Sequence, residues 1–102
     1  MALYLKSHKL DTPALPPGDE PAPTILVVDE DEQIRTAISG LVRSAGYRVA
    51  LYADATELLA DTLPEGVRCL VADIRLPSIS GLDLQRELAK RGERLPILFI
   101  TR

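Results

Sequence analysis

From residue 24 onward, the chain alternates between short apolar runs and longer amphipathic segments. Four runs rich in β-branched and other apolar residues are typical of buried strands, and they cover residues 24–28, 48–52, 67–72 and 95–101. Between them, residues 31–45, a segment from residue 54, and residues 82–91 have apolar positions at helical spacing. Helices between successive buried strands imply right-handed crossovers and a parallel sheet covered on both faces. We therefore expect an α/β fold of the order βαβαβαβ, an open doubly wound sheet.

The first 23 residues differ in kind from the rest. Five of the eight prolines lie between Pro13 and Pro23. Proline fixes φ and removes a backbone donor, so this stretch is expected to be an extended, poorly ordered leader over residues 1–23. A solvated tail is favoured over a docking segment. One small domain would then occupy residues 24–102.

Composition narrows the classes of function. The net charge is −3 and there are only four aromatic residues, which disfavours a nucleic-acid surface or a base-stacking platform. No stretch approaches the roughly 18 apolar residues of a membrane span, so no membrane association is expected. The single cysteine, Cys69, lies within an apolar run and is interpreted as a buried structural thiol. These features favour a cytoplasmic location.

Polar residues follow the predicted strands at ends that should share one rim of the sheet. Asp29 and Glu30 follow the first strand, Asp73 ends the third, and Thr101 ends the fourth. They become neighbours if the strand order is 2-1-3-4. Converging carboxylates repel one another unless a cation such as Mg²⁺, which prefers oxygen ligands, lies between them. With a metal bound, Asp73 could act as a nucleophile toward a phosphoryl donor, and Thr101 could hydrogen-bond a phosphoryl oxygen.

Simpler structural explanations exist for several of these residues. Acidic residues at 29–32 would cap a helix and favour its positive end, so the run alone favours capping and metal binding about equally. Asp31 is expected to serve the helix only. Asp73 is harder to explain in this way, because an Asp that closes an apolar strand must be solvated or paired. Pro77 would fix a turn, and Gly81 would permit close approach at a helix start.

Three segments resemble the receiver domains of two-component response regulators: ILVVDEDE (25–32), VADIRLPSISGLDL (71–84) and LPILFIT (95–101). In that family an acidic pair follows the first strand, and a phospho-accepting Asp ends the third. A Pro and a Gly follow that Asp four and eight residues later, and a Thr or Ser ends the fourth strand. The matching residues here are Asp29 with Glu30, Asp73, Pro77, Gly81 and Thr101.

The resemblance implies a flavodoxin-like sheet of order 2-1-3-4 and a phosphoacceptor role for Asp73. It implies Mg²⁺ held by Asp29, Glu30, Asp73 and the backbone carbonyl of Arg75, and a sensor histidine kinase as phosphodonor. The loop IRLPSISG is most similar to receivers that carry a helix-turn-helix transcriptional output domain.

The chain also departs from the family. The family continues with a helix, a fifth strand ending in a lysine that pairs with the phosphoryl group, and a further helix, whereas this sequence ends at Arg102. Lys90 is no substitute, because it lies on the third predicted helix. Glu30 replaces the commoner second Asp. We therefore expect a truncated receiver, in which residues 95–101 form an exposed edge strand that invites self-association or a partner strand.

Two alternatives stay open from the sequence. A receiver without the family lysine could be phosphorylation-defective and act only as a protein-interaction module. A phosphatase of the haloacid dehalogenase type could use Asp29 and Asp31 as its DxD pair. However, Gln33 stands where that family usually has Thr or Val, and the pattern around Asp73 would be left unexplained.

Overall fold

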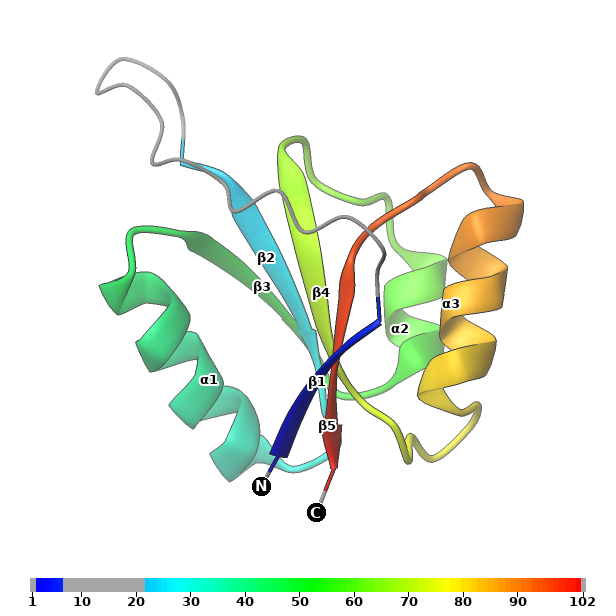
Figure 1. The fold of residues 1–102 in the computed structure, drawn as a ribbon, viewed down its shortest axis with the longest axis horizontal. Helices are drawn as coiled ribbons and strands as arrows, with labels where there is room; N and C mark the ends of the chain where they lie inside the picture. Colours follow the sequence, from blue (N-terminus) through cyan, green and yellow to red (C-terminus); the bar gives the residue numbers. More distant parts are fainter. Residues whose placement is uncertain (1, 7–21, 102) are drawn as a thin grey trace.

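The computed structural model describes residues 2–6 and 22–101, whose strands and helices alternate after the first two strands (Figure 1). The elements are β1 (Ala2–Lys6), β2 (Thr24–Val28), α1 (Glu32–Ser44), β3 (Arg48–Tyr52), α2 (Ala55–Ala60), β4 (Val67–Asp73), α3 (Gly81–Lys90) and β5 (Ile97–Thr101). None of the described helices is long and apolar enough to cross a membrane.

The sheet has five strands in the order β1-β5-β4-β2-β3. β2 pairs in parallel with β3 and with β4, and β4 pairs in parallel with β5. The four predicted strands are therefore present in the predicted order 2-1-3-4. Helix α1 lies on one face of the sheet, while α2 and α3 lie on the other (Figure 1). The prediction of a doubly wound α/β fold is confirmed.

β1 was not predicted from the sequence. It pairs antiparallel with β5, from Ala2 opposite Thr101 to Lys6 opposite Ile97. The expectation that β5 forms the edge of the sheet is therefore wrong, because β1 satisfies the backbone groups along its outer side. Residues 2–6 also depart from the expected poorly ordered leader. Residues 7–21 of that leader lie outside the described residues, so its extent up to residue 23 stays a prediction.

Two apolar clusters hold the sheet against its helices. The larger lies on the α2 and α3 face and includes the fully buried side chains Leu26, Leu58, Leu70 and Leu84. The smaller lies on the α1 face, where alternate residues of the same strands, such as Val27, join Ile38 of α1. Each fully buried side chain of this size contributes about 1.5–3 kcal/mol. Packing of the two clusters on opposite faces therefore fixes the position of each strand in the sheet, and with it the position of each strand end.

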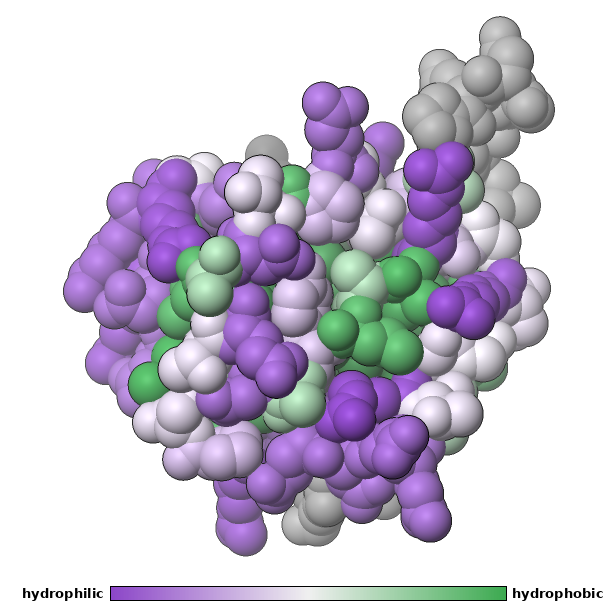
Figure 2. All heavy atoms as spheres, turned by 180° about the vertical axis from the view of Figure 1, so that it is seen from behind, coloured by the Kyte–Doolittle hydropathy of each residue, from purple (hydrophilic) through white to green (hydrophobic). Residues whose placement is uncertain are grey.

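The surface is mainly hydrophilic. Figure 2 shows an apolar area surrounded by hydrophilic residues on the side turned away from the viewer in Figure 1. Among the described residues, the exposed large apolar side chains are Leu41, Leu51 and Leu82. Some exposed apolar surface is ordinary on a folded protein and indicates no site by itself.

Candidate functional site

Two aspartates lie at the neighbouring carboxyl ends of β2 and β4. The parallel register pairs Val28 with Ala72, so the residues that follow, Asp29 and Asp73, occupy matching positions on neighbouring strands. Adjacent strands lie about 4.8 Å apart. Both side chains are buried, with exposed fractions of 0% for Asp29 and 4% for Asp73. A pair of buried acids this close requires compensation by hydrogen bonds or positive charge.

Backbone donors supply part of that compensation. The N–H of Asp31 donates to Oδ1 of Asp29 at 2.8 Å, and the N–H of Arg75 donates to Oδ1 of Asp73 at 2.9 Å. Each carboxylate is thus held by the amide two residues later, in the turn typical of Asp. The half-buried guanidinium of Arg35 donates to the backbone carbonyl of Asp29. This role of Arg35 could not be predicted from the sequence, because a helical Arg six residues after an acid carries no local signal for the contact.

The acidic run after β2 serves two purposes. The side chain of Asp31 caps α1 by accepting from the N–H groups of Gln33, at 2.9 Å, and Ile34, at 3.3 Å. The predicted helix-capping role of Asp31 is confirmed. Asp29, by contrast, is buried at the strand end and does not belong to the helix. Within this acidic run, Asp31 caps the helix and Asp29 belongs to the strand-end site.

The remaining predicted site residues lie near this pair but are more exposed. Thr101 ends β5 one residue beyond Ile100, the register partner of Asp73, and is half-exposed. Glu30 and Arg75 are exposed. Within residues 22–101, where side chains are described, no group of three or more His, Cys, Asp or Glu residues is placed to hold a metal ion. The structure brings Asp29 and Asp73 together and does not gather Glu30 with them, so the metal role of Glu30 stays a prediction.

The loop after Asp73 is tied to both β5 and α3. The N–H of Ile74 donates to the carbonyl of Ile100, and the N–H of Gly81 donates to the carbonyl of Ile74, each at 3.1 Å. A Cβ atom on Gly81 would lie 2.5 Å from Cε1 of Phe99 and 3.2 Å from the backbone oxygen of Asp73. The predicted close approach at Gly81 is confirmed. It seats the start of α3 directly against the strand end that carries Asp73.

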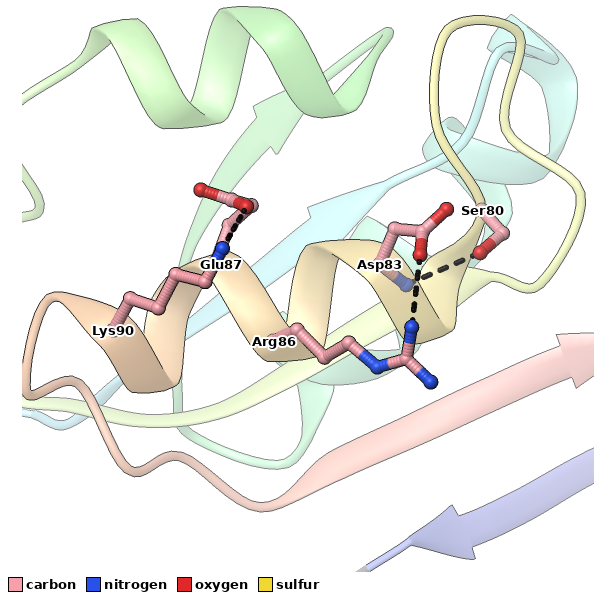
Figure 3. A network of polar contacts seen from close by, with 5 residues as sticks. All are labelled: Ser80, Asp83, Arg86, Glu87 and Lys90. Carbon is pink, nitrogen blue, oxygen red and sulfur yellow. Dashed lines mark hydrogen bonds and ion pairs between the residues drawn. The ribbon is translucent and has the colours of Figure 1, made fainter.

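Charges on α3 are paired with one another along the helix (Figure 3). Arg86 lies 3.5 Å from Asp83, and Lys90 lies 3.2 Å from Glu87. Ser80 caps the helix by accepting from the N–H of Asp83 at 3.1 Å. Because α3 begins beside the strand end and finishes at Lys90, this lysine lies at the far end of the helix from Asp73. The structure agrees with the expectation that Lys90 does not replace the family lysine.

Cys69 lies in β4, with its thiol 3.7 Å from the carbonyl of Leu70. Burial raises the pKa of this thiol above its ordinary value. A raised pKa lowers the thiolate fraction and therefore the reactivity. The interpretation of Cys69 as a structural rather than a reactive cysteine agrees with this, although its side chain is only partly buried.

Comparisons with known proteins agree with this geometry. The family model described as "response regulator receiver domain" matches residues 25–102. The chain is 47% identical over 77 residues to the response regulator protein TmoT of Ectopseudomonas mendocina, a match that covers 76% of this chain and 35% of TmoT. The chain therefore spans about a third of that relative.

Two solved structures are similar in fold. The response regulator StyR superposes with a TM-score of 0.72 at 41% identity, over 79% of this chain and 41% of StyR. The response regulator TrrA of Thermotoga maritima, solved in complex with Mg²⁺-BeF, has a TM-score of 0.66 at 28% identity, over 74% of this chain and 65% of TrrA. With the family match from residue 25 to residue 102, these similarities show that the chain belongs to the response regulator receiver domain family.

Proposed function

We propose that this receiver domain accepts a phosphoryl group on Asp73 in a two-component phosphorelay, with Mg²⁺ as cofactor and a sensor histidine kinase as phosphodonor. The observation that carries the proposal is the placement of Asp73. It is a buried carboxylate at the end of β4, beside Asp29 and oriented by the N–H of Arg75. It is a phosphoacceptor, rather than an enzyme that turns over a separate substrate.

In this reaction a carboxylate oxygen of Asp73 attacks the phosphorus atom of the donor. A new bond forms between that oxygen and phosphorus, and the bond from phosphorus to the donor nitrogen or oxygen breaks with its electrons leaving on the donor. The N–H of Arg75 holds the carboxylate in one orientation throughout. The hydroxyl of Thr101, at the end of β5, would donate to an oxygen of the transferred group.

The residues present fit a magnesium ion. The proposed ligands, Asp29, Glu30, Asp73 and the backbone carbonyl of Arg75, are all oxygen donors, which is the chemistry that Mg²⁺ prefers. Two of these carboxylates are buried at neighbouring strand ends, so a cation between them would relieve their repulsion. Mg²⁺ commonly keeps several waters and needs only one or two carboxylates, so exposed Glu30 would act through water. When bound, the ion neutralises charge that builds up on the transferred group.

A phosphate analogue tests the site without requiring turnover. Beryllofluoride with Mg²⁺ should shift the backbone amide NMR signals of the strand ends, with the largest changes at Asp73, Arg75 and Thr101. The shifts should require both components and be lost in Asp73→Asn. Changes centred elsewhere, or unaltered by that substitution, would contradict the proposal.

A second candidate is a receiver that acts as an interaction module without phosphorylation. Among the described residues, neither lysine lies at the strand carboxyl ends, so neither of these two would pair with a phosphoryl group on Asp73. Lys6 pairs with Ile97 at the start of β5, and Lys90 ends α3. The two candidates differ in a single property, since only the first gains a phosphoryl group on Asp73.

Self-association through β5 is proposed only for chains in which β1 has left that strand. In the structure β1 pairs along that strand, so a second chain can add to β5 only after β1 leaves. The proposed location is the cytoplasm, where a sensor histidine kinase presents its phosphorylated histidine.

A further inference from the structure

Asp54 occupies the N-cap position of α2, yet its carboxylate does not cap that helix. An Asp at the N-cap and a Glu three residues later commonly form a capping box, so Asp54 and Glu57 would be expected to satisfy the first amides together. In the structure Glu57 accepts from the N–H of Ala53 at 3.0 Å, whereas Asp54 makes no side-chain capping bond of the usual kind. The Asp54 carboxylate instead accepts hydrogen bonds from side-chain hydroxyl groups, one of which lies outside the helix.

Those donors come from two places. The hydroxyl of Thr56 donates to Oδ2 of Asp54 within the same turn. The hydroxyl of Ser78, which is 24 residues further along the chain, lies 2.9 Å from each of the two carboxylate oxygens. The hydrogen bond from Thr56 is the largest cause of a lowered pKa for Asp54. Burial opposes it, and the hydrogen bond from Ser78 lowers the pKa further. Asp54 is therefore a charged acceptor that joins α2 to the loop after β4.

That loop, residues 74–80, carries part of the proposed site. Its start is fixed by the bond from Ile74 to β5 and by the bond from the N–H of Arg75 to Asp73. Leu76 is buried in the core beneath it. Beyond Pro77, which restricts the backbone, the hydroxyl of Ser78 bonds to Asp54 and the hydroxyl of Ser80 accepts from the N–H of Asp83. The backbone from Arg75 to Ser78 is thus held on the core side by Leu76 and on the outer side by Asp54.

We propose that Asp54 and Ser78 are positioning residues for the phosphoacceptor site, forming a clamp that holds the Arg75 carbonyl where it meets the metal. This proposal rests on the function proposed above. The clamp touches neither the metal nor the phosphoryl group. It acts through the loop backbone, by reducing the number of conformations that residues 75–78 adopt before the metal binds.

A merely structural role predicts a different result. An exposed hydrogen bond that only supports the fold would change the free energy of unfolding and leave metal affinity unaltered. A positioning role changes the order of the loop and the affinity for Mg²⁺ while the free energy of unfolding changes little. The two roles are therefore separable by measuring loop exchange and Mg²⁺ affinity, with urea unfolding of each variant giving the free energy of unfolding.

The test compares Ser78→Ala, which removes the loop donor, with Thr56→Val, which removes the local donor to the same carboxylate. In the absence of metal, amide hydrogen exchange at residues 75–78 should be faster in Ser78→Ala and unchanged in Thr56→Val. In an NMR titration with Mg²⁺, Ser78→Ala should bind about three- to tenfold more weakly than the wild type, the effect of losing one solvent-exposed hydrogen bond. Asp54→Asn should weaken binding in the same direction, and the double variant should be little worse than Asp54→Asn, because the two residues act as one unit.

Equal Mg²⁺ affinity and equal loop exchange in Ser78→Ala and wild type would overturn the clamp. An equal loss in Thr56→Val would also overturn it, because that loss would assign the effect to α2 rather than to the loop. Failure of the wild type itself to bind Mg²⁺ would instead contradict the proposed function. The two failures are therefore distinguishable.

Discussion

Replacing Gly81 by Ala tests how closely α3 is seated against the strand end. The new Cβ would lie 2.5 Å from Cε1 and 2.9 Å from Cδ1 of Phe99, closer than carbon atoms normally approach. Phe99 is 3% exposed, so its ring cannot swing into solvent, and α3 or β5 must shift instead. Overpacking of this kind costs about 1–3 kcal/mol. Gly81 is the first residue of α3, where the helix propensity of Ala returns only a fraction of its interior value of about 1 kcal/mol, so we expect a net loss of about 1–2 kcal/mol.

Gly40→Ala provides a matched control. Gly40 lies in the exposed interior of α1, and a Cβ there would meet no heavy atom within 4 Å. The same chemical change should therefore stabilise the protein by about 0.5–1 kcal/mol, through helix propensity alone. Urea unfolding followed by far-UV circular dichroism gives both free energies, with the denaturant slope checked for constancy. A Gly81→Ala variant as stable as the wild type, or one that moves in the same direction as Gly40→Ala, would refute the close contact.

Three further predictions follow from individual contacts. The phenol of Tyr52 donates to Asp61 at 2.8 Å, and burial with this bond raises its pKa from 10.0 to about 12. The stabilisation from the protonated phenol should therefore be complete below about pH 10 and lost as the pH approaches 12. In a tyrosinate absorbance titration, Tyr52→Phe should remove the step at highest pH, and an unchanged curve would contradict this prediction. Asp31→Ala should destabilise the protein by about 1 kcal/mol in thermal unfolding through loss of the α1 cap, and an unchanged melting temperature would argue against that cap. Deletion of residues 1–6 should expose β5 and produce concentration-dependent association in sedimentation velocity, whereas a monomer at all concentrations would show that β5 needs no cover.

Local sequence patterns were sufficient for most of the fold. Apolar runs such as Thr24–Val28 are buried on both faces, so their composition alone identifies them as interior parallel strands. Strand ends could be predicted because Asp29 and Asp73 interrupt those runs abruptly. Gly81 could be interpreted correctly because glycine at a helix start beside a strand end has few other uses.

The features that were missed depend on contacts between distant segments. β1 has no strong local signal, and its pairing with β5 joins the two ends of the chain. The capping box expected at Asp54 obeys local rules, but the hydroxyl of Ser78 competes for the same carboxylate from 24 residues away. The contact from Arg35 to the Asp29 carbonyl likewise depends on how α1 packs over the strand end. In each case tertiary packing decides among several locally acceptable partners.

The central claim is that Asp73 accepts a phosphoryl group at a magnesium-dependent site. Intact-mass spectrometry after incubation with acetyl phosphate measures this directly, in the wild type and in Asp73→Asn, with Mg²⁺ and with a chelator. We expect the wild type to gain one phosphoryl group only when Mg²⁺ is present, and Asp73→Asn to gain none. A folded wild type that gains nothing, or an Asp73→Asn variant that gains as much as the wild type, would contradict the account.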